Sequence, residues 1–320
     1  MKKIFTMALA AIAALSMSAQ TYKIEMHVWV DGTVEYAKDL SKVDSITFVK
    51  KIVDPETPET PTNPNFTPKA FTVNAAGKQV YFSQGNLQAA YDGSKWNWFF
   101  AINQWDYVGN ATANTSITGN GIVSVNDTVD IFGWSTKANY YGITKSTDFS
   151  DYSGEFKDWG ATIGAGWYTL NTDEWVYLFC GRTDAKKLFG MGSVNGVNGT
   201  ILLPDDWAGE KFSDTANGLA DQGSYYYNKN GTNYSFHTYT AKQWSVMEAN
   251  GAVFLPAAGD RYGTVMYNVG SYGYYWSSTP NGKEEAYDVF FCSDLLVPQG
   301  YGDRGLRSYG LSVRLVKNVE

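Results

Sequence analysis

The side chains that could carry out catalysis are few in this chain. It contains two histidines and two cysteines: His27, His237, Cys180 and Cys292. An acyl-transfer site needs a nucleophile, a base and a group that orients the base, and the Gly-x-Ser-x-Gly turn typical of one such class is missing. The aromatic stretch around His237 favours a packed or hydrogen-bonded ring over a general base. We therefore predict a protein that is not an enzyme.

Metal ligands are equally sparse. The histidines and cysteines do not have a zinc-binding spacing. Two clusters of oxygen ligands exist, Asn126-Asp127 with Asp130 and Asp205-Asp206 with Glu210, and neither matches an EF-hand loop. We expect no metal and no cofactor. A structural calcium ion is the alternative to plain solvated loop carboxylates at these clusters.

Two pairs of adjacent acids, Asp173-Glu174 and Glu284-Glu285, invite comparison with a glycoside hydrolase. Such an enzyme places two carboxyl groups about 5 to 9.5 Å apart around the scissile bond, whereas adjacent residues usually point in different directions. The glycine-rich stretches lack the lysine pattern of a phosphate-binding loop. Neither pattern changes the prediction of a protein without catalysis.

A stretch near the C-terminus has side chains suited to recognition. Alternate positions combine acids, an aromatic ring, a thiol and an aliphatic chain: Asp288, Phe290, Cys292, Asp294 and Leu296. In a strand they share one face, while Val289 and Phe291 face the core. A following loop extends the patch with Tyr301, Asp303, Arg304, Arg307 and Tyr309. We predict that these residues bind a ligand; the alternative is that Phe290, Cys292 and Leu296 are ordinary buried residues.

The elements that position these residues are mostly short strands. Runs such as residues 79–82 and 252–255 are separated by Gly, Asn and Ser turns. The clearest helical signals are residues 171–180, where Asn171 or Thr172 can cap the start, and residues 240–250. Short strands, few helices and long glycine- and aromatic-rich loops predict an α+β fold.

Three segments precede this domain. Residues 1–19 carry two lysines, an apolar run and then small residues, as a secretory signal peptide does. Residues 20–52 alternate as a small β-hairpin segment with Asp31-Gly32 at a two-residue turn. Residues 53–68 hold five of the nine prolines and predict an extended linker. The main domain is expected at 69–320, exported to the periplasm, the outer surface or the extracellular space.

Charge and cysteine content limit the partners. The formal net charge of −7 becomes about −9 without the signal peptide, which argues against nucleic acid, whose phosphates require a basic face. The apolar run of the signal is too short to span a bilayer, which needs about 20 residues. We expect neither nucleic acid nor a membrane span. Whether Cys180 and Cys292 form one bridge or remain separate thiols is open.

Several motifs of the main domain resemble the Fibrobacter-type major paralogous domain and its relatives among secreted proteins of gut Bacteroidetes. They are residues 79–88 (QVYFSQGNLQ), 104–109 (QWDYVG), 130–134 (DIFGW), 254–261 (FLPAAGDR), 270–279 (GSYGYYWSST) and 310–316 (GLSVRLV). Those domains are similar to the C-type-lectin-like fold shared with formylglycine-generating enzymes. Residues 169–175 (TLNTDEW) resemble the helix-entry motif of that fold. The resemblance implies a C-type-lectin-like domain over most of residues 69–320.

The resemblance also has consequences for function. The enzyme branch of that fold requires a cysteine pair that Cys180 and Cys292 do not reproduce, and the Glu-Pro-Asn or Gln-Pro-Asp triplet of calcium-dependent lectins is missing. The patch around Asp288 resembles the varied surface of retroelement-diversified C-type-lectin-like proteins. This implies a secreted or cell-surface protein that binds a glycan or a surface protein. The alternatives are a structural or fimbria-associated subunit, and an enzyme of the formylglycine-generating or hydrolase kind.

Overall fold

The computed structural model divides the chain into two compact units, Met1–Glu56 and Thr57–Glu320. It describes residues 25–30, 33–39, 66–110, 112–117, 127–212, 220–221, 226–227, 234–300 and 305–319. The predicted signal peptide and most of the predicted linker lie outside these residues. No helix within the described ranges is long and apolar enough to cross a membrane.

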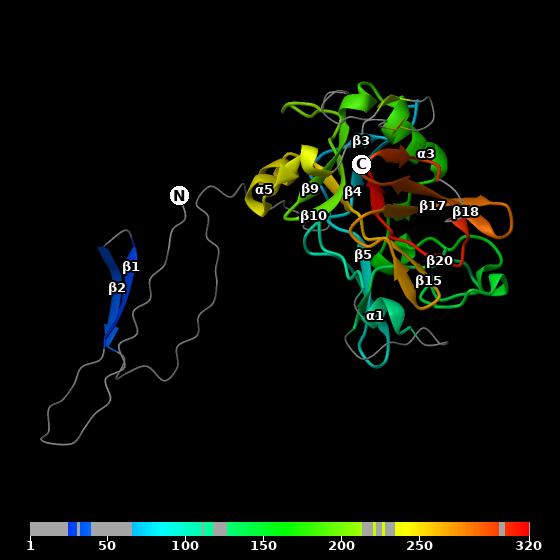
Figure 1. Ribbon diagram of the computed structural model, residues 1–320, viewed down its shortest axis with the longest axis horizontal. Coiled ribbons are helices and arrows are strands. Elements are labelled where there is room, and N and C mark those ends of the chain that lie inside the picture. Colours follow the sequence, from blue (N-terminus) through cyan, green and yellow to red (C-terminus); the bar gives the residue numbers. More distant parts are fainter. Residues whose placement is uncertain are drawn as a thin grey trace, which may run out of the picture. The chain divides into compact units, whose positions relative to one another are not determined.

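The smaller unit contains the predicted hairpin. Strand β1 (Glu25–Val30) pairs antiparallel with β2 (Thr33–Asp39), and Val30 faces Thr33 (Figure 1). This register leaves two residues for the connection, as Asp31-Gly32 predicts. The pairing is confirmed, while the turn residues themselves lie outside the described part of the chain.

The larger unit consists mainly of short strands in small sheets, with few helices (Figure 1). Its strands are β3 (Phe71–Thr72), β4 (Gln79–Phe82), β5 (Leu87–Tyr91), β6 (Trp96–Phe100), β7 (Thr128–Val129), β8 (Trp167–Thr169), β9 (Phe189–Val194), β10 (Val197–Leu202), β11 (Ala220–Asp221), β12 (Tyr226–Tyr227), β13 (Thr238–Tyr239), β14 (Val253–Pro256), β15 (Asp260–Tyr262), β16 (Val265–Tyr267), β17 (Gly273–Asn281), β18 (Glu285–Phe291), β19 (Leu295–Val297), β20 (Tyr309–Gly310) and β21 (Leu315–Asn318). Its helical segments are α1 (Thr112–Thr115), α2 (Gly160–Ile163), α3 (Thr172–Val176), α5 (Ala241–Ala249) and the shorter turns η2 (Phe149–Tyr152), η3 (Tyr177–Gly181), η4 (Ala185–Lys187) and η5 (Tyr234–Phe236).

The strands of this unit form sheets of the orders β13-β9-β10-β14, β11-β12-β19-β18-β17, β16-β15-β20, β3-β4-β21-β8 and β6-β5-β7. Neighbours pair antiparallel, except that β13 runs parallel to β9. The prediction of a mixed fold rich in short strands and poor in helices is confirmed at this level.

The larger unit begins before residue 69. Phe66 forms a bridge with Ser83, and the backbone N–H of the buried Thr67 donates to the Phe82 carbonyl (2.8 Å). Residues 66–68 are predicted as linker, but Phe66 and Thr67 belong to the folded unit because they pair with the end of β4.

Both predicted helices are present, and the first begins at Asn171, one of its two predicted caps. The Asn171 side chain accepts from the N–H of Glu174 (2.9 Å), and the Glu174 carboxylate accepts from the N–H of Asn171 (3.0 Å), which is a capping box at the start of α3. Thr240 and Gln243 make the same exchange at α5. After α3 the chain continues as the π-helical turn η3, so the predicted helix over 171–180 has two geometries.

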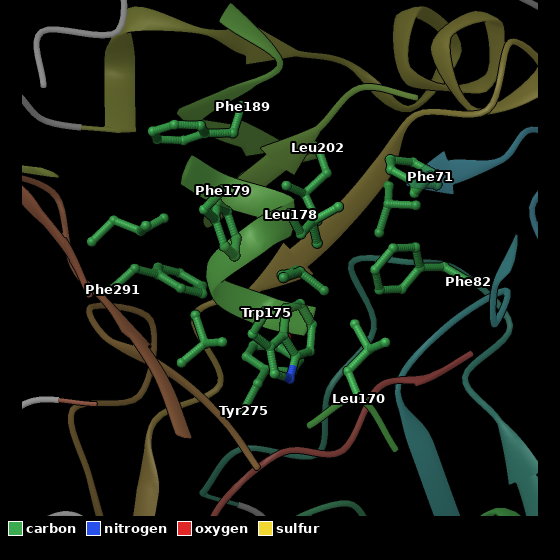
Figure 2. Close-up of a cluster of buried hydrophobic side chains, with 14 of the residues drawn as sticks. Phe71, Phe82, Leu170, Trp175, Leu178, Phe179, Phe189, Leu202, Tyr275 and Phe291 are labelled. Atoms are coloured by element: carbon green, nitrogen blue, oxygen red, sulfur yellow. The ribbon is translucent and has the colours of Figure 1, made fainter. Parts of the chain in front are cut away.

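Strands β17 and β18 run between two hydrophobic clusters. On one side Tyr275 and Phe291 pack in the cluster that contains Trp175, where the α3–η3 segment lies between β3–β4 and β17–β18 (Figure 2). On the other side Trp276 joins the cluster that contains Trp134. Both faces of this strand pair are therefore covered by apolar side chains.

Candidate ligand-binding face

The segment from β18 to β19 does not present the predicted exposed face. The exposed fractions are 2%, 5%, 8% and 0% for Asp288, Phe290, Cys292 and Leu296. β18 lies between β17 and β19, and hydrophobic clusters cover both of its faces. The prediction of an exposed strand is wrong for these residues, because alternation of residue types marks an exposed face only where one side of the sheet meets water.

The other residues of the predicted patch have different environments. Asp294 and Tyr309 are half-buried, and Arg307 is buried. The remaining members, Tyr301, Asp303 and Arg304, lie outside the described residues. Within the described part of the patch, Asp294 and Tyr309 therefore offer the most surface to a ligand.

Arg307 anchors the segment before β20 through contacts of its guanidinium group. Its guanidinium lies 4.2 Å from the centre of the Trp134 ring. It also donates to the backbone carbonyls of Tyr152 (3.2 Å), Gly154 (3.3 Å), Gly282 (3.0 Å) and Glu285 (3.0 Å). With these partners inside the protein, Arg307 is a residue that positions Tyr309 and not a ligand contact.

An exposed aromatic surface lies on the sheet β16-β15-β20. We call it the tyrosine face, and it consists of Tyr262, Val265, Tyr267 and Tyr309. Tyr262 pairs with Val265 on one side and with Tyr309 on the other, and directly paired residues point to the same side of a sheet. The Tyr262 and Tyr309 rings lie 4.8 Å apart. Tyr262, Val265 and Tyr267 are 40%, 48% and 41% exposed, so the surface is available for contact.

The β15–β16 hairpin that carries this face is stabilised by its turn and by hydrogen bonds from a buried arginine. Gly263 has φ +61°, which suits the first position of a two-residue hairpin turn. On the opposite side of β15, the fully buried Arg261 donates to the carbonyls of Gly263 (2.8 Å) and Thr144 (2.8 Å). This hairpin is absent from the predicted elements, although Gly263-Thr264 between Tyr262 and Val265 is a local signal for its turn.

Two buried acids lie at the inner end of the tyrosine face. Asp260 begins β15, is fully buried, and accepts from the Asn268 side chain (2.9 Å). Burial and the nearby charge of Asp260 raise the pKa of Asp288 to about 7. The Oδ2 atom of Asp288 has no hydrogen-bond partner among the described residues, and a Cβ at Gly300 would lie 2.6 Å from its Oδ1. This environment favours the neutral form of Asp288.

In the structure Cys180 and Cys292 do not form the disulfide that the sequence left open. Burial raises the pKa of Cys292 to about 11, and its Sγ makes a hydrogen bond to Asp294 Oδ1 (3.1 Å). The nucleophile in thiol chemistry is the thiolate, so this environment makes Cys292 unreactive at neutral pH.

We predict that Cys292 of the folded protein reacts with iodoacetamide at pH 8 about a hundredfold more slowly than the same thiol after unfolding. The Cys180→Ser variant isolates the Cys292 signal, and mass spectrometry follows the labelled fraction with time. Equal rates in folded and unfolded protein would contradict the burial and return Cys292 to the list of possible nucleophiles.

The predicted oxygen clusters are engaged by protein groups. Asp130 is buried and accepts from Asn114 (2.8 Å), Asp205 pairs with Arg182 (3.2 Å), and Asp206 pairs with Lys69 at the surface. Within the described ranges no group of three or more His, Cys, Asp or Glu side chains is arranged to hold a metal. Asp130 and Asp205 connect loops, so plain solvation is the wrong description of these two carboxylates.

His237 has the packed environment that the sequence predicts. Its ring lies against Phe212 with centroids 4.6 Å apart, and its carbonyl accepts from the N–H of Ser193 (2.8 Å). His237 therefore packs beside β9 through its ring and its backbone carbonyl.

We compared the chain with family models, curated proteins and solved structures, and none of them matches it. The residues and their geometry therefore carry the functional argument.

Proposed function

We propose that this chain is an exported binding protein without catalytic activity, of the C-type-lectin-like kind, and that it binds a surface protein through the tyrosine face. The motifs that resemble secreted lectin-like domains support the class. The observation that carries the proposal is the exposure of Tyr262, Val265 and Tyr267 side by side on one sheet.

The chemistry of the tyrosine face suits protein recognition. Tyrosine supplies a large contact area with few rotatable bonds, so little conformational entropy is lost on binding. The face is held from behind by Arg261, which reduces the cost of ordering it. A sheet surface of this kind fits a protein patch better than a single sugar, which binds in a concave site.

A binding role also agrees with the state of the reactive groups. Cys292 is a buried thiol with a raised pKa, and His237 packs against an aromatic ring. Arg307, Asp130 and Asp205 have partners within the protein. These five groups thus serve the packing and internal hydrogen bonding of the fold.

We predict that the double variant Tyr262→Ala/Tyr267→Ala weakens ligand binding at least about a hundredfold, because central tyrosines of interfaces each contribute strongly. A screen of the mature protein against cell-surface proteins, glycan arrays and intact cells identifies the ligand, and surface plasmon resonance measures the affinity. The control variant Tyr140→Ala/Phe236→Ala removes two other exposed aromatic rings and should bind as the wild type does.

Other outcomes would redirect the proposal. Binding that survives the tyrosine substitutions places the ligand elsewhere. A complete lack of ligands, with self-association that depends on residues 20–52, would favour the structural subunit, in which a strand of one chain extends the sheet of another.

A further inference from the structure

A pocket of about 390 Å³ lies on the larger unit, away from the tyrosine face. It is formed by the second half of α5, the loop after β10 and Lys69. Figure 1 shows α5 (yellow) well separated from β15 and β20. The volume is in the range of sites that take small molecules. None of its lining residues belongs to the tyrosine face.

The loop after β10 is anchored so that Trp207 keeps a fixed position. Asp205 accepts from both the backbone N–H and the hydroxyl of Thr72, each at 2.6 Å. The Trp207 Nε1–H donates to the Glu210 carbonyl (3.1 Å), which fixes the orientation of the indole ring. The aromatic wall of the pocket is therefore formed before a ligand arrives.

The pocket has an ion pair on one wall. Lys69 Nζ and Asp206 Oδ2 lie 2.6 Å apart, and their side chains are 43% and 59% exposed. Gly251, with φ +92°, ends the α5 turn, and a Cβ there would collide with Lys69. The glycine thus lets Lys69 lie close against the end of α5, beside the pocket.

Apolar groups form another part of the lining. Trp207 and Met247 are half-buried and pack on the cluster beneath α5, and Val246 is 53% exposed. The site therefore combines a fixed aromatic ring and aliphatic groups with polar groups, among them the ammonium of Lys69 as a donor and the carboxylate of Asp206 as an acceptor.

We propose that this pocket binds one pyranose unit of a saccharide. A pyranose ring has an apolar face of C–H groups and an edge of hydroxyls. The indole and Val246 match the apolar face, while Lys69 donates to one hydroxyl and Asp206 accepts from its neighbour. The proposal concerns a second site and does not depend on the tyrosine face.

The ion pair selects among ligand classes. A hydrocarbon side chain of a peptide would remove water from Lys69 and Asp206 without replacing the lost hydrogen bonds, which is unfavourable. A phosphate or sulfate would meet the carboxylate of Asp206. Neutral hydroxyl groups satisfy both partners, and charge-assisted hydrogen bonds of this kind are the stronger ones.

The test is a titration of the full mature protein with the methyl pyranosides of glucose, galactose, mannose and N-acetylglucosamine. The indole N–H signals are followed by NMR, and the Trp207→Ala variant identifies the Trp207 signal. We expect at least one pyranoside to shift that signal. In the variants, binding is followed through the backbone amide signals of Val246 and Met247, which also line the pocket. The affinity should be at least tenfold weaker in Trp207→Ala and at least fivefold weaker in Lys69→Ala/Asp206→Ala.

The controls separate binding from folding. The Lys69–Asp206 pair is at the surface and contributes little to stability, so the double variant should melt at the wild-type temperature. Tyr262→Ala/Tyr267→Ala should keep the pyranoside response, which distinguishes this site from the tyrosine face. The proposal is overturned if no pyranoside shifts the Trp207 signal, or if the affinity is unchanged in both pocket variants. The proposal would also be overturned if a peptide of residues 54–65, from the proline-rich segment, shifts the Trp207 signal and the pyranosides do not.

Discussion

Replacement of Arg314 by Met should lower the free energy of unfolding by about 3–5 kcal/mol. Arg314 is fully buried and donates to Asn86 Oδ1 (3.2 Å) and Gln104 Oε1 (2.9 Å). Gln104 in turn donates to Glu248 (2.9 Å). Burial raises the pKa of Glu248, and the hydrogen bond from Gln104 and the charge of Arg314 oppose this increase. Methionine fills part of the space but leaves the acceptors and the half-buried acid without the compensating cation.

The measurement is a comparison of urea unfolding curves followed by tryptophan fluorescence. Lys145→Met removes one positive charge from an exposed position and serves as the matched control, with an expected change within about 0.5 kcal/mol. Equal midpoints for Arg314→Met and Lys145→Met would show that the buried network is not needed for stability.

The network around Arg314 explains how distant segments of the larger unit are joined. Asn86 donates to the Tyr275 hydroxyl (3.1 Å), and that hydroxyl donates to the Pro256 carbonyl (2.9 Å). Arg314 therefore connects the loop between β4 and β5 with α5, β14 and β17. A polar network of this kind contributes most when each member has a partner, which is why loss of one member is expected to be costly.

Local features of this fold could be predicted from the sequence because they depend on neighbouring residues. Asn171 with Glu174 and Thr240 with Gln243 are caps three residues apart, and each marks the start of a helix. The β1–β2 pairing likewise follows from a two-residue turn between alternating runs. These signals require no knowledge of the tertiary structure.

The faces of β18 could not be predicted in this way. A period of two separates the two sides of a strand, but it does not say whether either side meets water. Asp288 and Phe290 are covered because β18 lies inside a sheet between two clusters. The tyrosine face is partly local, because Tyr262 and Val265 flank the turn at Gly263-Thr264. Tyr309 joins it only when β15 pairs with β20, which lies far along the chain. The exposure of a strand face and the complete candidate site therefore depend on tertiary pairing that local patterns do not contain.

Asp288 has the second large expected effect on stability, and the direction of its pH dependence follows from the raised pKa of its carboxyl group. The folded-state pKa is about 7, compared with a value of 3.8 for an ordinary Asp. Between these values the folded state binds more protons than the unfolded state, so stability falls as the pH rises from about 4 to about 7. With 1.36 kcal/mol for each pKa unit, the total contribution is about 4 kcal/mol.

Asp288→Asn should abolish this dependence, because the amide stays neutral throughout this pH range. We expect the variant and the wild type to unfold at similar urea concentrations near pH 4, and the variant to be more stable by about 4 kcal/mol at pH 8. Asp151→Asn changes an exposed acid and should retain the wild-type dependence on pH. Parallel curves for Asp288→Asn and wild type across this range would mean that Asp288 is ionised and compensated in the folded protein. Divergence of the curves would instead show that Asp288 is protonated and uncharged inside the folded protein at neutral pH.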